Sequence, residues 1–201
     1  MTSSSGREER RYLITIRGIA IGIFLIAACE VAYAIAIGSA FLVKDGFDWI
    51  YDVLLYGMAA IIFGRGARAE RIAALAGAAI MFVSIGETIY DMVMKIVAPR
   101  QIEPVLLGVS ALSTIVVVLM VVAALLRFRG SPNPLIETTW LSARNDAIFA
   151  TVYAVFQFMA RSAPMRGPEL ALDAFAILLT LQAIYVIIRD VRADAARSRP
   201  A

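Results

Sequence analysis

Long apolar stretches, separated by short polar segments, occupy most of this chain. A membrane-spanning helix needs about 20 mostly apolar residues, and six stretches reach roughly that length. They are Leu13–Ile37, Lys44–Phe63, Arg71–Val97, Val105–Leu126, Ile136–Met159 and Leu170–Ile188. The stretch Val105–Leu126 carries no charged residue at all. The pattern therefore predicts an all-α integral membrane bundle of six transmembrane helices.

Basic residues divide unequally between the two ends of the predicted bundle. Thirteen of the 19 Lys and Arg residues fall on the side of the chain termini and five on the opposite side. Because Lys and Arg in short loops favour the cytoplasm, both termini are predicted to be cytoplasmic. The chain then divides into a disordered or interfacial N-terminal tail (1–12), a transmembrane domain (13–190) and a short basic C-terminal tail (191–201).

The composition supports a membrane protein and excludes several kinds of site. Hydrophobic residues make up 61% of the chain and charged residues 17%, against about 25% charged residues in soluble domains. The chain has no His and a single Cys, Cys29, so neither a disulfide framework nor a Cys/His zinc cage is available. The net charge of +3 follows the predicted topology, and we expect no nucleic-acid partner.

Two acidic residues lie inside the second apolar stretch. Asp48 and Asp52 are four positions apart and would share one face of a helix. Ionisable side chains at membrane depth are costly unless a partner offsets their charge, and they usually mark a functional site. A divalent cation would be a suitable partner.

A second polar pair with the same spacing lies in the fifth stretch. Ser142 and Asp146 are also four positions apart, so two facing helices could present three carboxylates and a hydroxyl at one depth. Such an all-oxygen set suits hard or borderline cations. The alternative is that these side chains form hydrogen bonds between helices. Arg144 would point away from this face, and Asn145 would be rotated from it by about 100°.

The remaining charged residues within the stretches have simpler interpretations. Glu30 and Asp45 could line an entrance or support the ligands from outside the centre, but solvation near helix ends is the better explanation. Glu87, Asp91 and Lys95 follow at intervals of four. The order of Asp91 and Lys95 favours an intrahelical ion pair near the outer interface.

Five local patterns, in order, resemble the transmembrane half of the cation diffusion facilitator family. Gly38–Ser39 followed by Asp48-x-x-x-Asp52 resembles the second-helix half-site of the family, and Ala67-Arg68-Ala69-Glu70 resembles the start of its third helix. ETIYDMVMKIVAP (87–99) resembles the end of that third helix. WLSARNDA (140–147) resembles the fifth-helix half-site, and Leu172-Asp173 resembles the start of the sixth helix.

This resemblance implies a divalent-metal/proton antiporter with Asp48, Asp52, Ser142 and Asp146 as metal ligands. Ser142 stands where the family commonly has His, which puts zinc selectivity and ordinary proton coupling in doubt. The cytoplasmic domain of the family, which binds metal and helps dimerisation, is not expected in this chain. A homodimer would then form through the transmembrane helices.

The sequence thus predicts a secondary transporter in the cytoplasmic (inner) membrane, not an enzyme. It would export Zn, Mn or Fe as substrate in exchange for protons, and no cofactor is expected. The alternative is a degenerate, non-transporting family member that acts as a membrane scaffold or regulatory partner. An intramembrane aspartyl hydrolase is a remote third option, because acids one turn apart on one helix cannot clamp a peptide bond from both sides.

Overall fold

The structure is a computed structural model that describes the backbone of residues 2–97, 104–160 and 166–197. Side chains are described in these ranges except at 2–6, 40–42, 44–45, 47–48, 104–113, 153–160 and 166–169. The elements in order are α1 (Thr2–Ile37), α2 (Ala40–Ile62), α3 (Ala67–Val97), α4 (Pro104–Leu125), the short 3₁₀ helix η1 (Leu126–Phe128), α5 (Pro134–Ala160) and α6 (Arg166–Arg197).

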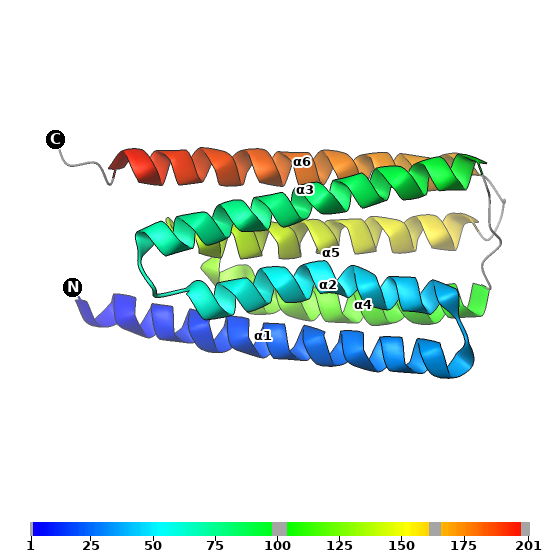
Figure 1. The fold of residues 1–201 in the computed structure, drawn as a ribbon, viewed down its shortest axis with the longest axis horizontal. Coiled ribbons are helices and arrows are strands. Elements are labelled where there is room, and N and C mark those ends of the chain that lie inside the picture. Colours follow the sequence, from blue (N-terminus) through cyan, green and yellow to red (C-terminus); the bar gives the residue numbers. More distant parts are fainter. Residues whose placement is uncertain (1, 98–103, 161–165, 198–201) are drawn as a thin grey trace.

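The six long helices form one bundle with their axes roughly aligned (Figure 1). No strand occurs in the described ranges, so the predicted all-α class is confirmed. In the described part of the chain, three helical segments are long and apolar enough to cross a membrane: Arg7–Ile37, Ala67–Val97 and Leu170–Arg197. Two shorter apolar segments, Trp49–Ile62 and Thr114–Phe128, lie in α2 and at the end of α4 with η1.

The helices extend beyond the apolar stretches that predicted them. Residues 2–12, expected to be a disordered or interfacial tail, form the first turns of α1, which begins at Thr2. At the other end of the chain α6 continues to Arg197. Hydropathy marks only the part of a helix that suits lipid, whereas Arg and Glu are good helix formers in water. These charged residues therefore prolong the helix beyond its apolar part.

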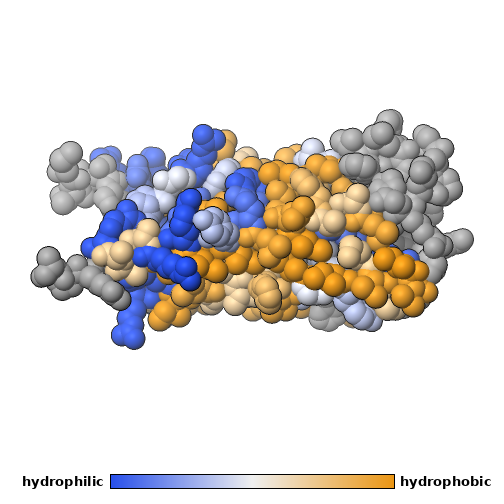
Figure 2. Space-filling model, turned by 90° about the horizontal axis from the view of Figure 1, so that it is seen from above, coloured by the Kyte–Doolittle hydropathy of each residue, from blue (hydrophilic) through white to orange (hydrophobic). Residues whose placement is uncertain are grey.

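Both chain termini lie at the same end of the bundle (Figure 1), which we call the proximal end; the opposite end is the distal end. In the view of Figure 2, hydrophilic residues gather toward the proximal end, and an apolar surface covers much of the rest of the bundle. This distribution suits a protein with its midsection in lipid. That the proximal end faces the cytoplasm stays a prediction.

A glycine reverses the chain between α1 and α2. Gly38 has a φ of 71°, in the left-handed region that glycine adopts without a steric penalty. The Gly38 N–H donates to the Ile35 carbonyl at 3.2 Å, and the Ser39 N–H donates to the Ala34 carbonyl at 2.9 Å. These bonds satisfy carbonyls at the end of α1 and allow α2 to pack back along it.

The helices pack mainly as α1 with α2, α3 with α6, α5 with α6 and α4 with α5. Helix α3 runs obliquely across the bundle and its distal part ends beside α6 (Figure 1). Nearer its proximal end, α3 makes a close approach at Gly77. A Cβ atom there would lie 2.8 Å from both Leu55 Cδ1 on α2 and Thr138 Cγ2 on α5.

Aromatic packing closes the proximal half of the bundle. Tyr12 of α1 is fully buried, and its ring contacts Phe63 and Phe128 edge-on at centroid distances of 4.6 and 5.2 Å. Its hydroxyl shares a hydrogen bond of 2.9 Å with Thr139 of α5. The proximal interior is therefore filled by side chains, and open volume begins further along the bundle.

Candidate metal centre

A cavity of about 340 Å³ lies between α2, α3, α5 and α6. On α3 its lining recurs at Ile80, Ser84, Glu87 and Asp91, the three-to-four-residue spacing of one helix face. On α6 the lining runs from Asp173 to Thr180. The cavity thus extends from the middle of the bundle toward the distal end.

The cavity brings together three of the four residues predicted as metal ligands. Asp52 of α2 lines it together with Ser142 and Asp146 of α5. Both carboxylates are partly buried, and both face the same cavity. Like charges held together inside a membrane protein need a cation or a proton to offset them. The oxygen atoms here are of the kind that divalent cations bind.

Asp48 is the fourth predicted ligand. It belongs to α2, but its side chain lies outside the described residues. Among the side chains that are described, no group of three or more His, Cys, Asp or Glu residues is arranged to hold a metal ion. The described set therefore contributes two carboxylates and one hydroxyl to the centre, and the role of all four residues stays a prediction.

Tyr56 is a buried neighbour of this centre that the sequence did not reveal. It is 1% exposed and lies close to Ser142 in the interior of the bundle. Its position four residues after Asp52 continues the spacing that identified Asp48 and Asp52. A tyrosine in an apolar stretch is usually part of a core, so the spacing alone did not identify Tyr56 as a neighbour of the centre.

The neighbouring polar residues of α5 are bound to α6. The Asn145 amide donates to the Leu179 carbonyl at 2.9 Å and accepts from Arg144 Nη2 at 2.9 Å. Arg144 also donates to Gln182 Oε1 at 2.6 Å. The Arg144 guanidinium is thus bound to amide oxygens and, as expected, is not among the residues that line the cavity. Asn145 does line it, although its amide is already engaged.

Two charged residues have partners that the sequence did not predict. Glu30 of α1 accepts a hydrogen bond of 2.8 Å from the Trp49 indole of α2, so it links two helices within the bundle. Lys95 was predicted to pair with Asp91 along α3. Its ammonium instead contacts Asp173 of α6, at 2.9 and 2.7 Å from the two carboxylate oxygens.

A second polar cluster holds the proximal loops together. The Glu70 carboxylate accepts from the Gly64 N–H at 2.7 Å and from the Asn133 side-chain amide at 2.6 Å. The Asn133 carbonyl oxygen caps α5 by accepting from the Leu135 N–H at 2.9 Å, as Asn often does at a helix start. Glu70 therefore joins the α2–α3 loop to the start of α5.

The sequence was compared with models of known protein families. The model of the cation efflux transmembrane domain matches residues 17–196, a range that includes parts of all six long helices and both halves of the candidate centre. No curated protein matches the chain.

Proposed function

Because this chain belongs to the cation efflux family, whose members transport metal cations, we propose that it is a secondary transporter that exports a divalent metal cation in exchange for protons. The observation that carries the proposal is the shared cavity. Asp52 from α2 and Asp146 from α5 line the same space, although 94 positions separate them in the sequence. Membrane proteins rarely hold two acids together without a function for them.

In the proposed centre, Asp48, Asp52 and Asp146 bind the cation, and Ser142 acts as a weak fourth ligand or holds a bound water. An all-oxygen set favours Mn²⁺ or Fe²⁺, and Zn²⁺ would bind without its preferred imidazole. Carboxylates must be deprotonated to bind metal. The empty centre would therefore carry protons that the arriving cation displaces, which supports exchange of metal for protons.

The proposal includes a direction and a location. The excess of basic residues at the proximal end supports a cytoplasmic proximal end in the inner membrane. The cation would then enter from the proximal side, and a rearrangement of the helices would expose the centre to the distal side. We propose a homodimer formed through the transmembrane helices.

Transport by the purified protein in proteoliposomes tests this function. Uptake of Zn²⁺, Mn²⁺ and Fe²⁺ is measured under a proton gradient for the wild type and for Asp48→Asn, Asp52→Asn and Asp146→Asn. Each variant should lose most of the uptake, because each removes a charge from the centre. Asp190→Asn is the matched control: Asp190 pairs with Arg189 on the surface and should transport like wild type. Wild-type uptake by all three centre variants would refute the assigned ligands.

The replacement of the family's His by Ser142 favours a second function, that of a non-transporting scaffold or regulatory partner. Calorimetric titration of Zn²⁺, Mn²⁺ and Fe²⁺ into the wild type and Asp146→Asn distinguishes the two. A transporter binds at least one metal with a defined stoichiometry that the variant loses. A scaffold shows no such binding with either protein.

A further inference from the structure

The distal half of the cavity contains acids that the proposed centre does not use. Glu87 and Asp91 of α3 and Asp173 of α6 line it, and among the described residues no Lys or Arg does so. A divalent cation that leaves the centre for the distal end would pass these carboxylates. A carboxylate on this path that no positive charge neutralises would bind the cation and slow its release.

Asp173 differs from the other two because it is buried, and it contacts a cationic side chain. It is 7% exposed, and Lys95 Nζ contacts both of its carboxylate oxygens, at 2.9 and 2.7 Å. Removing the Asp173 carboxylate from water is costly, and the Lys95 side chain that offsets its charge is itself 42% exposed, so the attraction compensates for only part of that cost. Stability alone is therefore a weak explanation for an ion pair at this position.

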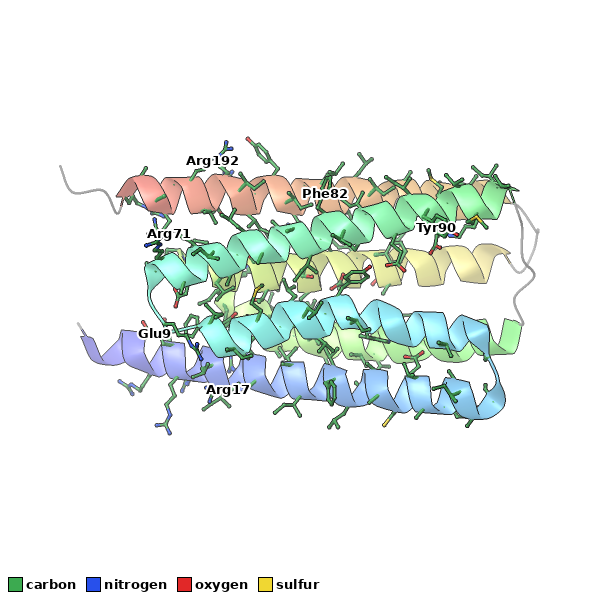
Figure 3. The ribbon with its side chains drawn as sticks, viewed as in Figure 1. Glu9, Arg17, Arg71, Phe82, Tyr90 and Arg192 are labelled. Carbon is green, nitrogen blue, oxygen red and sulfur yellow. The ribbon has the colours of Figure 1, made fainter. Side chains whose placement is uncertain are left out.

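The opposite end of the same helix pair provides a comparison. Arg71 of α3 meets Asp194 of α6 at 3.6 Å, and neither residue lines the cavity. Figure 3 labels Arg71 near the proximal end of α3, whereas Tyr90 marks its distal half. A partly exposed pair of this kind contributes little to stability. The two ion pairs therefore join the same two helices, and only the distal pair includes a residue of the cavity wall.

We propose that Lys95 determines the release of the metal: by neutralising Asp173, it prevents this carboxylate from retaining the divalent cation on its way out of the cavity. The inference rests on the proposed transport function. The Lys95 ammonium occupies both oxygens of Asp173, so a passing cation meets a neutral ion pair in place of a bare carboxylate. The flexible stem of Lys95 lets the head group stay in place while the helices move.

The test uses the neutral variant Lys95→Gln in the complete protein. Removal of the ammonium exposes the charge of Asp173 to the cavity, so Zn²⁺ and Mn²⁺ should bind more tightly and leave more slowly. We expect a roughly tenfold decrease in the release rate, as one additional uncompensated charge near the path would produce. The rate is measured by stopped-flow release of bound metal to a chelator, and the Kd by titration.

Two further variants separate this role from a merely structural one. Lys95→Gln/Asp173→Asn removes both charges and should restore release to within about twofold of wild type. Arg71→Gln breaks the proximal pair and should leave release unchanged. A structural role predicts weaker metal binding in Lys95→Gln, which is the opposite sign. If Lys95→Gln does not fold, the experiment uses Lys95→Met, which retains the apolar stem of the side chain.

The outcomes also distinguish this inference from the proposed function. If the wild type binds and transports metal but Lys95→Gln releases it at the wild-type rate or faster, the role of Lys95 is refuted and the function stands. If the wild type binds none of Zn²⁺, Mn²⁺ and Fe²⁺, the proposed function fails and this inference fails with it.

Discussion

The hydroxyl groups of Tyr12 and Thr139 share a hydrogen bond of 2.9 Å, although 127 positions separate the two residues in the chain. Both side chains are fully buried. The bond joins α1 to α5 on the proximal side of the candidate centre, three residues before Ser142 in the sequence. It thereby fixes the part of α5 from which the proposed ligands project.

Tyr12→Phe should lower the free energy of unfolding by about 1 kcal/mol, because the buried Thr139 hydroxyl loses one partner. Thr139 still donates to the Ile136 carbonyl at 2.8 Å, so the loss stays modest. Thermal unfolding in detergent measures the difference. Tyr33→Phe on the exposed face of α1 is the control. An equal loss in both variants would show that the Tyr12–Thr139 bond contributes nothing specific.

Gly77→Ala should destabilise the bundle by about 1–3 kcal/mol, the usual cost of an overpacked contact. The new methyl group would lie 2.8 Å from side-chain atoms of both Leu55 and Thr138. Gly86→Ala on the same helix meets no atom within 4 Å and should stabilise α3 by up to about 1 kcal/mol. Opposite signs in denaturation by heat would confirm the close approach at Gly77, and equal signs would contradict it.

Asn133→Ala should cost about 1 kcal/mol, because α5 loses its N-cap and Glu70 loses a donor. Asn133→Asp retains the cap but places a second carboxylate against Glu70, to which the amide now donates at 2.6 Å. At neutral pH this variant should also be less stable than wild type. Because salt screens the repulsion between exposed charges, the difference between Asp and Asn should shrink at high ionic strength. Stability curves at two salt concentrations measure it.

Metal binding should release protons, because protons and the cation compete for the same carboxylates. The apparent affinity for Zn²⁺ or Mn²⁺ should therefore fall as the pH is lowered. Calorimetry in two buffers with different ionisation enthalpies counts the protons released. Asp146→Asn, which is expected to lose metal binding, should release no protons in the same titration and is the control. A count of zero for the wild type would rule out proton exchange at this centre.

The sequence predicted the fold well because membrane helices are marked by their own apolar length. Six stretches predicted six helices, and the structure contains them in the expected order. The predicted apolar stretches are shorter than the helices where charged residues prolong a helix past its apolar part, as in residues 2–12 of α1. Hydropathy cannot detect such turns, because water and protein contacts stabilise them in place of lipid.

The sequence predicted which residues of the candidate centre share a face of the same helix. Intervals of four indicated that Ser142 and Asp146 share a face, and the structure brings both to one cavity with Asp52. Partners on other helices were not predictable. Lys95 had an acid four positions before it in the sequence, yet it contacts Asp173, 78 positions away. Local spacing suggests a partner for a charge, and only packing decides which partner it has.

The close approach at Gly77 divides α3 into two unequal lever arms. Ten residues separate Gly77 from the start of the helix and twenty from its end, which correspond to about 15 and 30 Å of helix. A rotation of α3 about this contact would therefore move its distal tip roughly twice as far as its proximal tip. Small changes near the packed proximal side would be amplified at the end where the cavity and the Lys95–Asp173 ion pair lie.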